Sequence, residues 1–132
     1  MIFLDSDILS YYFSGNTKIR EQIVDTLKNK DQIALTIINV YEVLKGLRWR
    51  KNIKKETMFK NFLEAVPVFT IDDDVTKSAA DIYTDLRKNG KIIGDADILI
   101  AAIIIRNDGK LVTNNAEHFE NIKEINLINW LE

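Results

Sequence analysis

The sequence predicts an α/β protein in which helices cover both faces of a mainly parallel β-sheet. Short apolar runs alternate with longer helical patterns, one helical segment is apolar on every side, and several apolar runs end abruptly at polar residues. Strands that alternate with helices form parallel sheets with two buried faces. We therefore expect a three-layer α/β/α sandwich with four or five central strands.

The length of the chain predicts one domain. Its 132 residues, 46% hydrophobic and 29% charged, suit a globular protein with one core. The sequence contains no repeat, low-complexity stretch or linker, and its one proline, Pro67, lies inside an apolar run. We expect residues 1–132 to fold as a single unit.

Two strands and four helices are expected in the first half of the chain. The run Ile2–Leu4 is apolar throughout, as in a strand buried on both faces. Ile19 and Ile23 recur at helical spacing, and Thr36 is a suitable N-cap for the helix that follows it. The expected strands are Ile2–Leu4 and Gln32–Leu35, and the expected helices are Asp7–Phe13, Asn16–Asn29, a segment after Thr36, and a segment around Phe59–Val66.

Three strands and three helices are expected in the second half. Acids at Asp72–Asp74 favour a helix start, because negative charge is favourable at the positive end of the helix dipole, and Gly90 suits its end. The segment Asp95–Ile105 is almost entirely apolar, so this helix should be central and buried. The expected strands are Val68–Ile71, Lys110–Thr113 and Asn126–Ile128, and the expected helices are Asp72–Lys88, Asp95–Ile105 and the short Ala116–Phe119.

The composition excludes several kinds of chemistry. The chain has no cysteine and one histidine, His118, so disulfides, thiolate metal sites and zinc sites with several histidines are excluded. Any bound metal must be a hard, oxygen-ligated ion such as Mg²⁺ or Mn²⁺. The longest apolar run, Ile98–Ile105, is too short to span a bilayer, and the early acids Asp5 and Asp7 do not fit a signal segment. We expect a cytoplasmic protein with no membrane partner.

Three acids occur beside expected core positions, near the ends of elements. Asp5 directly follows the first strand, and Asn115 lies just beyond the strand that ends at Thr113. The carboxyl ends of parallel strands share one edge of the sheet, where ligands bind. Glu42 lies within an apolar helical face, and Asp97 begins the most apolar helix. Carboxylates gathered at one point repel one another, and a divalent cation relieves that repulsion.

Each of these acids also has a structural explanation when it is considered alone. Helix N-caps, first-turn acids and ion pairs one turn apart are all common. A lone histidine is also more often structural than catalytic. The alternatives are an N-cap for Asp5 or Asp95, a first-turn acid for Asp7, an ion pair with Lys45 for Glu42, and a structural role for His118.

The order and neighbours of the acids are more specific. Over nearly the whole chain, the sequence resembles the PIN-domain ribonucleases, specifically the VapC-type toxins of toxin–antitoxin pairs. The segments that resemble the family are Ile2–Leu9 (IFLDSDIL), Ile38–Gly46 (INVYEVLKG), Ile93–Ala102 (IGDADILIAA) and Leu111–Phe119 (LVTNNAEHF). The resemblance implies a PIN-like fold with Asp5, Glu42 and Asp97 as the catalytic acids, holding Mg²⁺ or Mn²⁺, and with Asp95 as a further candidate ligand.

The resemblance also indicates accessory residues and two departures from the family pattern. Asp7 stands where Asn is usual, and Asn115 stands where many PIN domains have a fourth Asp; Glu117 and Glu120 are nearby acids that could compensate. The accessory candidates are Ser6, Asp7, Thr113, Asn115 and Glu117.

The activity that the resemblance implies is metal-dependent hydrolysis of RNA by an endoribonuclease toxin. It also implies a cognate antitoxin protein as a partner, and a homodimer. Aromatic residues near the first and third helices are candidates for the groove that the antitoxin occupies, although they could equally be core residues. They are Tyr11, Tyr12, Phe13 and Trp49.

A basic stretch changes the interpretation of the charge. The net charge of −2 argues at first against a nucleic-acid partner. However, six of the 18 Lys and Arg residues fall between positions 45 and 55, where no acid occurs. A positive stretch that starts one helical turn after Glu42 suits RNA, and Trp49 could stack on a base; a solvated helix end is the alternative. The proposed RNA-binding residues are Lys45, Arg48, Arg50, Lys51, Lys54 and Lys55.

Two other functions remain open from the sequence. An apolar strand followed by Asp5-Ser6-Asp7 also resembles haloacid-dehalogenase-type phosphatases, in which Asp5 would be the nucleophile and Asp7 an acid. That interpretation leaves Glu42 unexplained. A non-catalytic binding module on the same fold, in which the acids only form salt bridges, is the second alternative.

Overall fold

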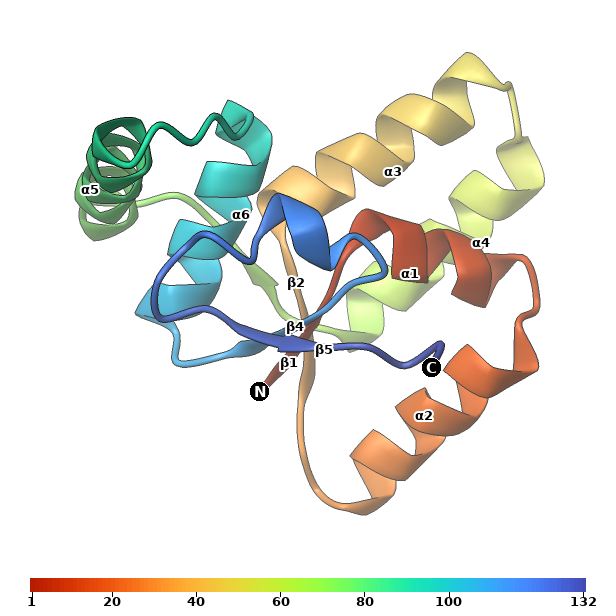
Figure 1. The fold of residues 1–132 in the computed structure, drawn as a ribbon. Helices are drawn as coiled ribbons and strands as arrows, with labels where there is room; N and C mark the ends of the chain where they lie inside the picture. Colours follow the sequence, from red (N-terminus) through yellow and green to blue (C-terminus); the bar gives the residue numbers. More distant parts are fainter.

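The structure is a computed structural model that describes residues 1–132, and its centre is a parallel five-stranded sheet (Figure 1). The strand order is β3-β2-β1-β4-β5, and each neighbouring pair is parallel. The strands are β1 (Ile2–Leu4), β2 (Ile33–Thr36), β3 (Val68–Phe69), β4 (Lys110–Val112) and β5 (Asn126–Ile128). The helices are α1 (Ser6–Phe13), α2 (Thr17–Lys28), α3 (Ile37–Trp49), α4 (Ile53–Ala65), α5 (Asp73–Lys88) and α6 (Asp95–Arg106), with a 3₁₀ turn, η1, at Ala116–His118.

Two hydrophobic layers lie on the two faces of the sheet. Successive residues of β1 point to opposite faces: Phe3 joins the core formed with α5 and α6, whereas Ile2 and Leu4 join the core formed with α1 to α4. The expected three-layer α/β/α architecture is therefore confirmed. Figure 1 shows α5 and α6 together on one side of the sheet, away from α2 and α4.

Helix α6 is buried, as its composition predicts. Each residue of Ile100–Ile104 is fully buried, and α5 packs along this helix. A helix that is apolar on every side is stable only when it is surrounded in this way. The helix ends just before Gly109, where an added Cβ would lie 2.5 Å from the ring of Phe3. This position therefore requires glycine for close packing.

The register of the strands positions the site. Leu4 pairs with Val112, and Phe3 pairs with Ala34, so the carboxyl ends of β1, β2 and β4 lie at one edge of the sheet. The connections from β1 lead first to β2 on one side and later to β4 on the other. Ligands of α/β proteins bind beyond such a reversal of strand order.

Most elements lie where the sequence predicts them, with a few differences at their ends. The strand expected at Val68–Ile71 is restricted to β3, and Asp72 caps α5 through a hydrogen bond to its side chain from the N–H of Val75. The structural alternative for Asp95, an N-cap of α6, is wrong: Gly94 is the N-cap, without any side-chain bond. None of the helices combines the length and apolar character needed to cross a membrane.

Candidate active site

Asp5 is a buried carboxylate at the junction of β1 and α1. It is 7% exposed and is the N-cap of α1, where its Oδ1 accepts a hydrogen bond from the backbone N–H of Ser6 at 2.9 Å. The same oxygen accepts from Nδ2 of Asn39 at 3.0 Å, and Oδ2 accepts from the hydroxyl of Thr113 at 2.7 Å. Burying a carboxylate is costly unless donors replace water. These three donors fix its orientation, so Asp5 is a cap and a site residue at once.

Asn39 is a site residue that the sequence interpretation missed. Its Oδ1 accepts from the Thr36 hydroxyl at 2.7 Å, and its backbone N–H donates to the same hydroxyl at 3.1 Å. The amide nitrogen is thereby left to donate to Asp5 and, at 3.0 Å, to Oγ of Ser6. A polar residue in an apolar helical segment, one turn before Glu42, is the signal that could have identified it.

Glu42 is connected to the same network from α3. The hydroxyl of Ser6 donates to its Oε1 at 2.8 Å. The alternative ion pair with Lys45 is not formed; the Lys45 ammonium lies 5.1 Å from the centre of the Tyr41 ring. Glu42 is half-buried and has no cationic partner. This favours a functional role over a structural one.

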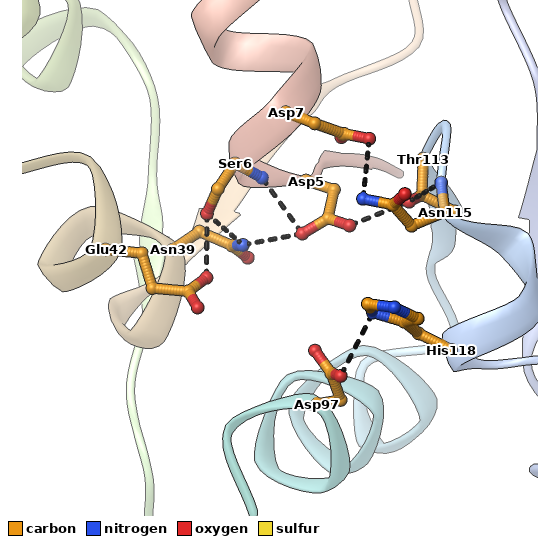
Figure 2. Close-up of polar contacts among 9 residues, drawn as sticks. All are labelled: Asp5, Ser6, Asp7, Asn39, Glu42, Asp97, Thr113, Asn115 and His118. Carbon is orange, nitrogen blue, oxygen red and sulfur yellow. Dashed lines mark hydrogen bonds and ion pairs between the residues drawn. The ribbon is translucent and has the colours of Figure 1, made fainter. Parts of the chain in front are cut away.

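Asp97 faces Asp5 and Glu42 from the first turn of α6 (Figure 2). Its Oδ2 lies 3.4 Å from Nδ1 of His118 in η1. Burial raises the pKa of Asp97; the pairing with His118 opposes the rise, and the charges of Asp5 and Glu42 add to it. His118 therefore has a specific acidic partner, which the sequence interpretation did not foresee.

The three carboxylates come from three separate elements and point toward a common space, here called the acidic opening (Figure 2). No three His, Cys, Asp or Glu side chains lie close enough together to enclose an ion. However, the only basic group that pairs with Asp5, Glu42 or Asp97 is His118. Neighbouring carboxylates repel one another, and a cation between them offsets that repulsion. A set of oxygen donors without a strong cationic partner fits Mg²⁺ or Mn²⁺ chemically.

Asp7 lies beside this opening but is bound to another segment. Its Oδ2 accepts from the backbone N–H of Asn114 at 2.9 Å and from Nδ2 of Asn115 at 3.2 Å. Asp7 therefore links α1 to the loop after β4. Burial raises the pKa of Asp7, the charge of Asp5 raises it further, and the N–H groups of Asn114 and Ile8 partly offset the rise.

Two other predicted acids lie further out. Asp95 and Glu117 are both exposed, and neither forms a side-chain hydrogen bond or an ion pair. Glu117 lines the same surface hollow as Asp97 and His118, whereas Asp95 does not. The structure thus brings Asp5, Glu42 and Asp97 together and leaves Asp95 at the rim.

The basic stretch does not form a single surface. Arg48 is paired with Glu56 at 3.2 Å, and Lys51 and Lys54 are exposed. In contrast, Arg50 and Lys55 line a groove that also contains Ser6 and Glu42.

The aromatic candidates divide between core and surface. Tyr12 and Phe13 are half-buried and form ring contacts with each other and with Phe62. Tyr11 is more exposed, and Trp49 is 86% exposed at the end of α3.

Comparison with known proteins agrees with this geometry. A model of the PIN domain family matches residues 2–125. Ribonuclease VapC1 of Methanocaldococcus jannaschii is 31% identical over 126 residues, covering 96% of this chain and 84% of the relative, and ribonuclease VapC2 of Rickettsia felis is 27% identical, covering 96% of each. The crystal structure of VapBC2 from R. felis, bound to a DNA fragment from its promoter, contains a chain with a TM-score of 0.90 and 28% identity, covering 98% of this chain and 99% of that one. The chain therefore belongs to the PIN-domain family, as a relative of the VapC ribonucleases.

Proposed function

We propose that this PIN-domain protein is an endoribonuclease that hydrolyses RNA phosphodiester bonds with the help of Mg²⁺ or Mn²⁺, as the toxin of a toxin–antitoxin pair. The observation that carries the proposal is the opening formed by Asp5, Glu42 and Asp97 at the carboxyl edge of the sheet, in a relative of the VapC ribonucleases. The proposed site of action is the cytoplasm, where RNA is available.

Asp5, Glu42 and Asp97 are the residues that would hold the metal. When bound, such an ion lowers the pKa of a water molecule and stabilises negative charge on the phosphate and the leaving oxygen. Asp95, on the same turn as Asp97, is the further candidate ligand, and exposed Glu117 is an accessory acid. One or two ions are compatible with this donor set.

The remaining site residues orient the carboxylates. Thr113 and Asn39 each hold one oxygen of Asp5, and Ser6 donates to Glu42, so both carboxylates have fixed positions before RNA arrives. Fixed ligands favour catalysis because they do not have to be reorganised during the reaction. Asn115, whose side chain donates to Asp7, is positioned at the rim to contact the RNA.

The partners of this protein also belong to the proposal. RNA is attracted by the basic residues that follow Glu42, because phosphates exchange their counterions for Lys and Arg. An antitoxin protein is proposed as the inhibitory partner, since the R. felis relative was crystallised as VapBC2, and a homodimer is proposed by the family resemblance. Exposed Tyr11 and Trp49 are candidates for these contacts.

The phosphatase alternative does not fit the site. It requires Asp5 as a nucleophile and Asp7 as an acid acting at the same substrate. Asp7, however, is bound to the loop after β4 through the backbone N–H of Asn114. The alternative also leaves Glu42 without a role.

The proposal is tested with purified protein, RNA and Mg²⁺ or Mn²⁺. We expect Asp5→Asn and Asp97→Asn each to lower kcat/KM for RNA cleavage by at least about a hundredfold, because each removes a charge that holds the ion. A chelator should abolish cleavage, and calorimetry should detect divalent ions only in protein that keeps both acids. Asp25→Asn, on the exposed face of α2, is the matched control. If Asp97→Asn cleaved RNA as the wild type does, the assignment of Asp97 as a metal ligand would be wrong. Wild-type protein that cleaves no RNA and binds neither ion would instead support a non-catalytic binding module.

A further inference from the structure

A groove leads from the acidic opening along α3 to the basic end of that helix. Its volume is about 180 Å³; it contains Ser6 and Glu42 at one end and Arg50 and Lys55 at the other. Along α3, four residues, or about 6 Å of helix, separate Glu42 from Gly46, against which the Arg50 guanidinium lies. The surface between the two ends is apolar and is formed by Leu9, Phe13, Val43 and Leu47.

Arg50 and Lys55 line the groove, and neither forms an ion pair, so both can bind a ligand there. Arg48 is engaged by Glu56. Arg50 forms no ion pair, and Lys55 forms only a 3.4 Å hydrogen bond to the hydroxyl of Ser14. The basic end of the groove therefore carries positive charge that no acid of the chain neutralises.

Gly46 allows the Arg50 side chain to lie along the groove. A Cβ at Gly46 would lie 3.3 Å from both terminal nitrogens of the Arg50 guanidinium group. Glycine inside a helix is less favourable than alanine. The absence of a side chain at Gly46 thus keeps the guanidinium close to α3, within the groove.

We propose that this groove is an RNA subsite, in which Arg50 and Lys55 hold a phosphate that neighbours the scissile one. The proposal rests on the proposed ribonuclease function. Guanidinium and ammonium groups are strong phosphate donors, and the apolar surface accommodates the ribose and base between the two phosphates. A ligand that spans the groove must present one phosphate to the acidic opening and a second to the cations. A polynucleotide strand meets both requirements, and the spacing of the two ends then helps to set where the strand is cut.

The first experiment measures RNA binding without cleavage. A short fluorescein-labelled single-stranded RNA of randomised sequence is titrated with the Asp97→Asn protein at several salt concentrations. We expect Arg50→Ala to weaken binding and to reduce the slope of log K against log salt by about 0.7, the value for one phosphate contact on a single strand, and Arg50→Ala/Lys55→Ala by about twice as much. Arg87→Ala, an exposed arginine on α5 on the other side of the sheet, is the control and should leave the slope unchanged.

The second experiment locates the phosphate in cleaving protein. After the cleavage site of an RNA has been mapped, a single neutral methylphosphonate linkage is moved along the strand. At one position near the cut, the substitution should lower kcat/KM of the wild type by about tenfold or more, the scale of a charged hydrogen bond. It should cause no further loss in Arg50→Ala. Equal losses in both proteins at every position would overturn the subsite.

The outcomes separate this inference from the proposed function. If wild-type protein cleaves RNA and Arg50→Ala/Lys55→Ala binds and cleaves it as the control does, only the subsite is wrong. If those variants lose only inhibition by the antitoxin, the groove is a protein-binding surface and the subsite is again wrong. If the salt slopes change as expected but wild-type protein cleaves no RNA, the nuclease function fails and the groove is a phosphate-binding surface without a scissile phosphate beside it.

Discussion

At the scale of single residues, the buried side-chain amide of Asn39 is oriented by its hydrogen bonds. The Thr36 hydroxyl donates to the side-chain oxygen Oδ1 of Asn39, so the side-chain amide nitrogen is directed to Asp5 and Ser6. Asn39 therefore connects Asp5 directly, and Glu42 through Ser6, into one network. Positioning residues of this kind commonly affect activity nearly as strongly as the ligands that they hold.

Asn39→Ala is expected to lower kcat/KM for RNA cleavage by about ten- to a hundredfold. It should also lower the free energy of unfolding by about 1–3 kcal/mol, because the buried partners lose their hydrogen bonds. Asn39→Asp keeps an acceptor for Thr36 but cannot donate to Asp5, so its activity should be no higher than that of Asn39→Ala. Steady-state kinetics and urea unfolding measure both effects, and exposed Asn61→Ala is the control. Normal activity in Asn39→Asp would contradict this role.

The raised pKa of Asp7 predicts how stability depends on pH. Its pKa is raised in the folded state, mainly by burial. The folded state therefore holds the proton more tightly than the unfolded state, and this carboxyl lowers stability as the pH rises from its ordinary value near 4 through the raised value. Asp7→Asn removes the titration while leaving an oxygen that accepts from the N–H of Asn114.

We expect Asp7→Asn to be more stable than wild type at neutral pH, with an advantage that shrinks as the pH falls and is absent below the ordinary pKa of Asp. Urea unfolding in a chelating buffer across this pH range provides the measurement. Asp25→Asn, on the exposed face of α2, is the control and should show no such trend. An advantage of constant size at every pH would show that the charge of Asp7 is not its cause.

At the scale of elements, the site depends on how β1 and its neighbours end. Asp5 terminates the central strand and caps α1, while Thr36 and Thr113 follow or end the strands on either side. Helix α6 brings Asp97 to the same edge because its apolar body is fixed between the sheet and α5. The packing of the buried helix is therefore a condition for the site.

Gly109→Ala is expected to destabilise the protein by about 1–3 kcal/mol, the usual cost of overpacking a core. The added Cβ would lie 2.5 Å from the ring of Phe3, in the middle of β1. In the double variant with Phe3→Leu, the smaller side chain should remove part of this cost, so the two changes should not be additive. Urea unfolding of the two single variants and the double variant measures this coupling; strict additivity would show that the Phe3 ring is not the obstacle.

At the scale of the whole molecule, the small net charge results from acidic and basic regions that nearly cancel. The net charge of −2 combines an acidic opening with a basic end of α3. Within the six basic residues, tertiary contacts leave Arg50 and Lys55 facing the groove, whereas Arg48 is paired with Glu56 on α4. The sequence predicts the positive stretch. Which of its residues are paired with acids and which face the groove depends on how α3 packs against α4.

Much of the fold was predictable because it follows from local patterns. Apolar runs, helical periodicity and the all-apolar segment around α6 depend on neighbouring residues only, and they led to the confirmed α/β/α architecture. The errors occurred at the ends of helices and strands, where several neighbouring residues could be the cap or the last residue. Asp95 has the right chemistry for an N-cap, but α6 starts at that residue, so Gly94 occupies the cap position.

The sequence by itself determined the elements, the restriction of any metal site to oxygen ligands, and the position of Asp5 and Thr113 at strand ends. The tertiary structure decided which side chains meet: Asn39 with Asp5, Asp97 with His118, and Asp7 with the loop after β4. Residues far apart in the chain are brought together by strand order and by the rotation of each helix about its axis. Those quantities are set by packing of the whole core, which local periodicity does not specify.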